Sequence, residues 1–123
     1  MKNYGKELII DLHKCNPNTF NRKSIKKYFR FICREINMQP EKLVWWDDLY
    51  TPQKERETEP HLVGTSAVQF IRTSNITIHT LDRLKRVYLN IFSCKDFNAQ
   101  KATSISKIWF KGEIISCTTI IRQ

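Results

Sequence analysis

The sequence predicts an α+β fold in which one antiparallel sheet carries two helices on one face. Apolar residues alternate with polar ones in several short segments, as in strands, and recur at helical spacing in two longer segments. These segments follow one another in the order strand, helix, strands, helix, strand, which favours an antiparallel layer covered by helices. The chain has 123 residues, enough for one domain with its own core and too few for two. We therefore expect residues 1–123 to form a single domain.

The first strand is predicted over residues 6–13, where Leu8, Ile10 and Leu12 share one face. The tetrapeptide Cys15-Asn16-Pro17-Asn18 that follows has the composition of a turn.

The first helix is predicted from about Asn21 to Ile36 or Asn37. Its apolar residues recur with the spacing of one buried stripe: Ile25, Tyr28, Phe29, Ile32 and Ile36. A second stripe is basic and consists of Lys26, Arg30 and Arg34. Such a row is able to meet phosphate groups, but a solvent-exposed face is the commoner arrangement and the one we expect.

The second strand is predicted over residues 43–50, after a helix end at Met38-Gln39-Pro40. Trp45 and Trp46 then point to opposite faces. One of the two belongs to the core, and the other is free to stack on a flat ligand or to lie in a dimer interface.

Residues 51–60 are polar, charged and bounded by proline, as expected of a mobile surface connection. Acidic residues gather in and before this segment: six of the twelve lie between Glu41 and Glu59. We interpret this either as a solvated loop, which is the commoner case, or as a negative region near a cationic substrate.

Strands at about 63–71 and 75–80 are predicted to form a central hairpin, followed by a strand at 87–94. The two strands after the hairpin turn each have an apolar side for the helices and a mixed side. His79 and Cys94 fall on the mixed side. The simplest interpretation is one shared active face.

A second helix is predicted to start after Asn98, a residue that suits a helix N-cap. Its buried stripe is expected to consist of Ala102, Ile105, Ile108 and Trp109. Gly112 suits the following turn, and residues 113–121 are predicted to form a last strand with apolar residues on both faces.

Composition narrows the class of protein. No apolar run approaches the length needed to span a membrane, and the first seven residues lack a signal-peptide core, so we expect a cytoplasmic protein with no membrane partner. The four cysteines show no C-x-x-C pairing, and we therefore expect neither a zinc site nor a disulfide framework. The net charge of +9 raises the question of nucleic acid, but a solubilising surface is the simpler explanation.

Four residues stand at a distinctive spacing around the central hairpin. Ser74 is preceded by Ser66 at eight residues and followed by His79 at five and Cys94 at twenty. With Leu8-Ile9-Ile10-Asp11-Leu12-His13-Lys14-Cys15 near the amino terminus, this spacing resembles the small prokaryotic S-adenosylmethionine decarboxylases. The resemblance covers nearly the whole chain, and it implies a sandwich that assembles as a homodimer or a higher homo-oligomer, with active sites near the subunit boundary.

Decarboxylation of an α-amino acid needs an electron sink that no ordinary side chain supplies. The resemblance implies that the sink is a covalent pyruvoyl group derived from Ser74, which holds the substrate as a Schiff base. The Ser74 hydroxyl would attack the carbonyl of Thr73. Elimination and hydrolysis would then leave the pyruvoyl group on residues 74–123, with residues 1–73 as a separate, non-covalently held chain.

The resemblance also assigns the helpers of this chemistry. Ser66 would supply the hydroxyl donor for the oxyanion formed during processing. His79 would be the proton acceptor that removes the serine α-proton. Cys94 would be the proton donor after carbon dioxide leaves. A hairpin centred between Arg72 and Thr73 would place Ser66 directly across from His79, with Ser74 in the turn, where backbone strain can promote an acyl shift.

The function implied is S-adenosylmethionine decarboxylation, which supplies the aminopropyl donor for polyamine synthesis. The sequence departs from the family pattern at Thr73, where glutamate is usual, and at Leu81-Asp82-Arg83, where Trp-Pro-Glu is usual. An aromatic residue that commonly precedes the Gly-x-Ser turn is also missing. Arginine or ornithine therefore stays open as a substrate, and so does an unprocessed, non-catalytic homologue that regulates a partner. Nucleic-acid binding is the weakest hypothesis.

Overall fold

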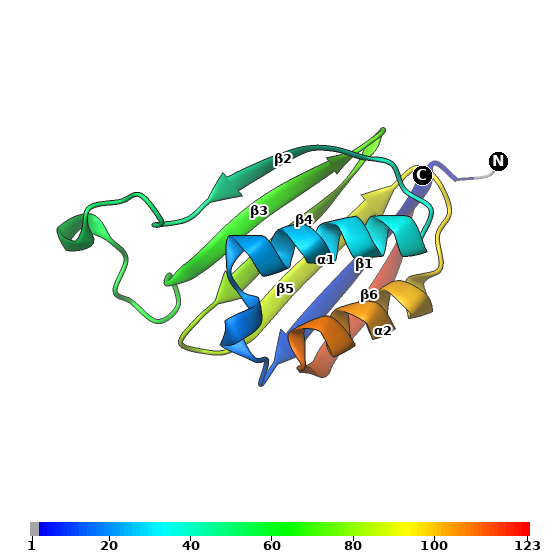
Figure 1. The fold of residues 1–123 in the computed structure, drawn as a ribbon. Coiled ribbons are helices and arrows are strands. Elements are labelled where there is room, and N and C mark those ends of the chain that lie inside the picture. Colours follow the sequence, from blue (N-terminus) through cyan, green and yellow to red (C-terminus); the bar gives the residue numbers. More distant parts are fainter. Residues whose placement is uncertain (1–2) are drawn as a thin grey trace.

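Six segments with alternating or β-branched residues pair into one antiparallel sheet, and two amphipathic helices cover one of its faces (Figure 1). The computed structural model describes residues 3–123. Its elements in chain order are β1 (Gly5–His13), η1 (Pro17–Thr19), α1 (Arg22–Glu35), β2 (Pro40–Trp46), η2 (Gln53–Glu55), β3 (Gly64–Ile71), β4 (Ser74–Leu81), β5 (Arg86–Ser93), α2 (Ala99–Phe110) and β6 (Glu113–Arg122). The strand order is β2-β3-β4-β5-β1-β6, and all neighbours are antiparallel. The predicted fold class is confirmed.

Helix α1 begins and packs as its sequence predicts. The side chain of Asn21 caps its first turn by accepting a hydrogen bond from the Ser24 N–H at 2.8 Å. The apolar stripe predicted for this helix is buried throughout, in a core cluster that also contains Leu8, Ile10 and Leu12 of β1. Each such side chain stabilises the fold by roughly 1.5–3 kcal/mol. The helix ends at Glu35, one or two residues earlier than predicted, before the left-handed Asn37.

Helix α2 begins after Asn98, as predicted, and its predicted stripe is confirmed in part, because Ala102 is buried and Ile105 and Trp109 pack against the core. Ile108 is 74% exposed, and the fully covered positions are Ala102, Ser106 and Phe110. Ser106 is at the centre of this stripe because its hydroxyl is hydrogen-bonded to the Tyr28 hydroxyl of α1 at 2.7 Å. Ser106, a polar residue, therefore lies in the core, whereas Ile108, which hydrophobic periodicity assigned to the core, is exposed.

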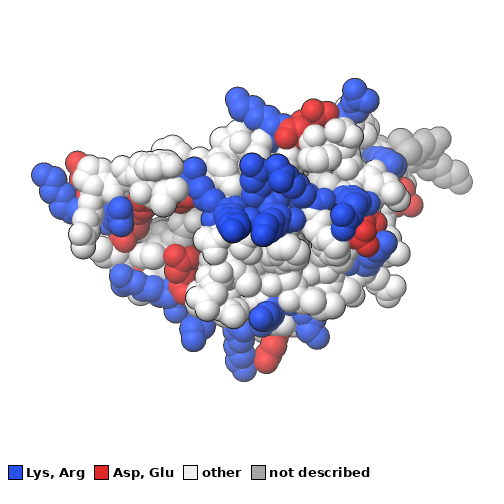
Figure 2. Space-filling view, viewed as in Figure 1, with Lys and Arg blue, Asp and Glu red and all other residues white. Residues whose placement is uncertain are grey.

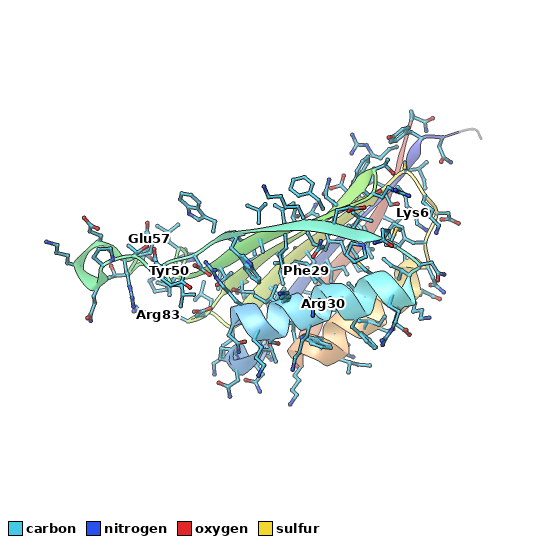
Figure 3. All side chains as sticks on the ribbon, turned by 45° about the horizontal axis from the view of Figure 1, so that its top comes forward. Lys6, Phe29, Arg30, Tyr50, Glu57 and Arg83 are labelled. Carbon is cyan, nitrogen blue, oxygen red and sulfur yellow. The ribbon has the colours of Figure 1, made fainter. Side chains whose placement is uncertain are left out.

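The basic stripe predicted on the first helix lies on the solvent side of α1. Lys26, Arg30 and Arg34 are exposed, and lysine and arginine side chains gather along this helix in Figure 2. Arg30 follows directly on the fully buried Phe29 in the sequence, and both are labelled in Figure 3. Only Arg34 of the three forms an ion pair among the described residues, with Glu35 at 3.6 Å.

The predicted second strand is displaced toward the amino terminus. β2 spans Pro40–Trp46 instead of 43–50, because its pairing with β3 extends to Pro40 and stops where Asp47 turns toward α1. The connection from β2 to β3 contains the short helix η2 and projects beyond the end of the sheet (Figures 1 and 3). Arg83 holds this connection by donating to the carbonyl oxygen of Thr58 at 2.9 Å.

The sheet face turned away from α1 and α2, which we call the open face, is covered by no other element of residues 3–123 (Figure 1). It carries exposed apolar side chains, including Trp46 at 83% exposure and Phe70 at 45%. As predicted, Trp46 and Trp45 lie on opposite sides of β2, and Trp45 packs against the core.

Neither helix in residues 3–123 has the length and apolar character required to cross a membrane.

Candidate active site

The central hairpin places Ser66 directly across from His79. Residues 64–71 of β3 pair with residues 74–81 of β4, and Ser66 is the register partner of His79. The Ser66 hydroxyl is hydrogen-bonded to Nδ1 of the His79 ring, and both side chains lie on the open face. The predicted pairing of Ser66 with His79 is therefore confirmed.

The turn of the same hairpin holds the bond between Thr73 and Ser74. Thr73 is left-handed, with φ of 63°, a conformation that is unusual for a β-branched residue and costs on the order of 1–3 kcal/mol. The sequence predicted Ser74 in the turn, and this prediction is wrong: Ser74 is the first residue of β4. Its side chain is nearly buried on the helix-covered face, and its hydroxyl donates to the Ser93 hydroxyl at 3.1 Å.

Cys94 lies beside this turn, one residue after the end of β5. Its sulfur is 3.0 Å from the Thr73 hydroxyl oxygen, whose proton is donated to the carbonyl oxygen of Arg72 at 2.6 Å. The Cys94 thiol is therefore the donor to Thr73. Gly5 of β1 packs so closely here that a side chain at this position would collide with the Ser93 carbonyl. The thiol therefore lies next to the residue that precedes Ser74.

The five candidate residues divide into two groups at opposite ends of β4. Thr73, Ser74 and Cys94 lie at its start, whereas Ser66 and His79 lie five residues along it. At the rise of a strand this separation is about 16 Å, and the alternation of side chains turns Ser74 and His79 to opposite faces. The shared active face predicted for His79 and Cys94 stays a prediction, but Ser74 lies on the face opposite to His79, because a five-residue spacing in a strand always changes the face.

A cavity on the open face adjoins Ser66 and His79. Its volume is about 340 Å³, and Trp46, Tyr88 and Asn90 contribute to its lining. Trp46 is the register partner of Ser66 in β2, which places its indole next to the Ser66–His79 pair. The sequence left open which tryptophan is available to a ligand, and the pairing of β2 with β3 identifies Trp46.

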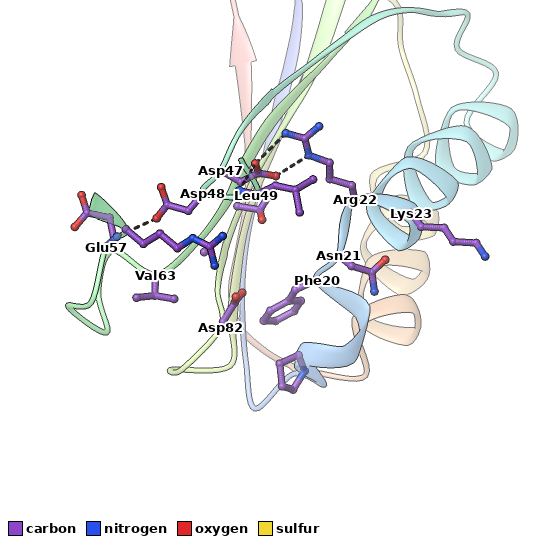
Figure 4. Close-up of a pocket in the computed structure, with 14 residues that line it drawn as sticks. Phe20, Asn21, Arg22, Lys23, Asp47, Asp48, Leu49, Glu57, Val63 and Asp82 are labelled. Atoms are coloured by element: carbon purple, nitrogen blue, oxygen red, sulfur yellow. Dashed lines mark hydrogen bonds and ion pairs between the residues drawn. The ribbon is translucent and has the colours of Figure 1, made fainter. Parts of the chain in front are cut away.

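A second cavity, of about 610 Å³, lies at the end of the sheet between α1 and the connection from β2 to β3 (Figure 4). Arg22 donates two hydrogen bonds to Asp47 there, at 2.7 and 2.9 Å. The guanidinium of Arg22 holds the pKa of Asp47 below its usual range. Asp48 accepts a hydrogen bond from the Glu57 N–H at 3.0 Å. Asp47 and Asp48, two of the clustered acidic residues, therefore form contacts that hold the connection from β2 to β3 in place.

The cysteines differ in their surroundings. Burial raises the pKa of the Cys15 and Cys33 thiols to about 11, whereas Cys94 is half-buried and Cys117 is exposed. No group of three metal-ligating side chains lies together among residues 3–123.

The strand order and the helix-covered face define the class as a two-layer α+β protein. A family model described as S-adenosylmethionine decarboxylase matches residues 6–123, and the chain belongs to this family. The crystal structure of the adenosylmethionine decarboxylase from Aquifex aeolicus is similar in fold, with a TM-score of 0.77 and 16% sequence identity over 99% of this chain and 92% of that chain. No curated protein matches the sequence.

Proposed function

We propose that this protein is a self-processing, pyruvoyl-dependent decarboxylase that acts on S-adenosylmethionine and so supplies the aminopropyl donor for polyamine synthesis. Family membership supports the reaction class. The observation that carries the self-processing is the left-handed Thr73 directly before Ser74, with the Cys94 thiol 3.0 Å from the Thr73 hydroxyl. Cleavage between the two residues would divide the domain into 1–73 and 74–123.

Processing begins with attack of the Ser74 oxygen on the Thr73 carbonyl carbon. The new C–O bond forms as the C–N bond breaks, and the hydroxyl proton ends on the nitrogen of Ser74. Loss of the Ser74 α-proton then breaks the bond from Cβ to the ester oxygen and releases Thr73 as a carboxylate. Hydrolysis of residue 74 consumes water and releases ammonia. Ser66 donates to the oxyanion in the first step, and His79 accepts the α-proton in the second.

The residues at the hairpin turn suit a pyruvoyl group derived from Ser74, because a residue with left-handed backbone precedes the serine and a thiol lies beside it. When formed, this group withdraws electrons from the carbon that bears the substrate carboxylate. The thiol of Cys94 supplies the proton that replaces carbon dioxide. Cys94→Ala should therefore spare most of the cleavage while reducing turnover or misdirecting the protonation. Full activity of this variant would contradict the assignment.

A second copy of the chain is part of this proposal. Ser66 and His79 are about 16 Å from Ser74 and on the other face of β4, too far for a proton transfer. In a two-fold dimer packed through the open faces, the Ser66–His79 pair of one copy can meet the hairpin turn of the other. The exposed Trp46 and Phe70 would be covered in the same contact. We therefore propose a homodimer with sites shared between its subunits.

Trp46 is the residue that we assign to the flat part of the substrate. It is 83% exposed and lines the cavity beside His79, whereas Trp45, which also contributes to the lining, is partly buried and packs against the core. Trp46→Ala should raise KM for S-adenosylmethionine about tenfold, and Trp46→Phe should restore most of the affinity, as expected of stacking. Tyr50→Ala, which removes another exposed aromatic residue, is the control. Carbon dioxide release from arginine or ornithine, and none from S-adenosylmethionine, would overturn the choice of substrate.

The mass of the purified protein under denaturing conditions tests the proposal. Two fragments divided between 73 and 74, with a ketone on the second, are expected for the wild type, and one intact chain is expected for Ser74→Ala. An uncut wild-type chain would instead favour the second candidate, an unprocessed homologue that regulates a partner. The observation behind this candidate is Thr73, which stands where glutamate is usual in the family.

A further inference from the structure

Two buried serines face each other at the end of the sheet where cleavage is proposed. Ser74 opens β4, Ser93 closes β5, and the two are register partners. Both lie on the helix-covered face, where Ser93 is fully buried and Ser74 is 7% exposed. The Ser74 hydroxyl donates to the Ser93 oxygen at 3.1 Å.

The remaining contacts of Ser93 fix the direction of this hydrogen bond. The Ser93 oxygen also accepts from the Lys95 N–H at 3.0 Å, and its own proton points to the sulfur of Met38 at 3.8 Å. A serine hydroxyl has one proton to donate and two lone pairs that accept. All three are in use, so Ser93 has no proton left for Ser74 and acts toward it only as an acceptor.

We infer that Ser93 is a positioning residue for self-cleavage, an inference that rests on the proposed processing at Thr73–Ser74. With its proton held by Ser93, the Ser74 oxygen keeps its lone pairs free for the Thr73 carbonyl carbon. A hydroxyl that donates a hydrogen bond is also the better nucleophile. Ser93 forms no covalent bond and retains its own proton, and the Ser74 proton is transferred to the amide nitrogen as the ester forms.

The first test compares cleavage rates of freshly purified chains by denaturing mass measurement. Ser93→Ala should slow cleavage about tenfold, the effect of one lost hydrogen bond in the transition state. Ser93→Cys, which keeps the size of the side chain but accepts weakly, should also be slow, and Ser93→Thr should restore the rate. Ser106→Ala is the matched control: it removes another fully buried serine hydroxyl, should lower stability, and should cleave at the wild-type rate.

The second test separates positioning from a general loss of structure. Hydroxylamine attacks an ester much faster than an amide, so it should split a chain that stalls after the acyl shift. His79→Ala, which stalls later, should be cut by hydroxylamine between 73 and 74, whereas Ser93→Ala should resist. Wild-type cleavage rates in Ser93→Ala and Ser93→Cys, or equal splitting of Ser93→Ala and His79→Ala by hydroxylamine, would overturn the role of Ser93 alone. An uncut wild-type chain would overturn the proposed function and this inference together.

Discussion

At the scale of single residues, Thr73 combines an unusual backbone conformation with a position directly before the proposed cleavage site. Its left-handed φ of 63° raises the energy of the uncut chain, and the proposed cleavage of the following peptide bond would release this strain. The thiol of Cys94 is hydrogen-bonded to the same residue. Threonine in place of the family's usual glutamate is thus compatible with cleavage, because the reaction uses the backbone carbonyl and the side chain serves to hold the neighbouring thiol.

Relief of this strain should stabilise the uncut protein and slow its cleavage. In the uncleavable Ser74→Ala background, Thr73→Gly should raise the free energy of unfolding by about 1 kcal/mol, measured by thermal denaturation. With Ser74 present, the same change should slow cleavage. Lys85→Gly is the matched control, because Lys85 is also left-handed, with φ of 56°, but lies in the turn between β4 and β5. An equal effect of both glycines on the cleavage rate would show that the strain at Thr73 has no special part.

The four thiols should react in the order of their exposure. The raised pKa values of Cys15 and Cys33, about 11, leave little thiolate at neutral pH, and burial hinders access to both. Brief alkylation with iodoacetamide at pH 7.5 should therefore modify Cys94 and Cys117 only, as read by peptide mass mapping. Unfolding in urea should make all four equally reactive. Early labelling of Cys33 in the native protein would contradict the packing of α1 on the sheet.

At the scale of elements, periodicity predicted most of the fold because most elements have one apolar and one polar face. The strands β1, β3, β4 and β5 and the helix α1 follow this rule, and their predicted bounds agree with the structure to within two residues. Helix α2 departs from it, because the hydrogen bond between Ser106 and Tyr28 puts a serine in the core and leaves Ile108 outside. The end of β2 was also missed, since it depends on the pairing of Asp47 with Arg22, which lies 25 residues away in the sequence.

The ion pair between Arg22 and Asp47 ties the start of α1 to the end of β2, and its contribution should depend on pH. Arg22 lowers the pKa of Asp47 in the folded state, so the stabilisation is present above the unfolded-state value of about 4 and is lost as the pH falls through the folded-state value. Asp47→Asn should destabilise the protein by about 1 kcal/mol at pH 7, and this difference should shrink at low pH in urea denaturation. Asp96→Asn, at an exposed ion pair with Lys6, should change stability less.

At the scale of the whole molecule, one chain keeps the two groups of proposed site residues apart, at the two ends of β4. The sequence predicted the pairing of Ser66 with His79, because a hairpin with a known centre fixes its register. It did not predict that Ser74 and His79 lie on opposite faces, although the odd spacing between them in one strand contains that information. Under the proposed function, the residues at this spacing meet only between two copies of the chain.

Mixing two inactive variants tests whether the site is shared. Ser74→Ala cannot be cut, and His79→Ala lacks the base, so each homodimer should stay intact. In a mixed dimer, the His79→Ala chain presents Ser74 to the intact Ser66 and His79 of the Ser74→Ala chain. Co-expression in equal amounts should therefore lead to cleavage of about half of the His79→Ala chains, the share that statistical pairing places in mixed two-fold dimers. A site contained within one chain would give no cleavage in the mixture, because no single chain would then hold both groups.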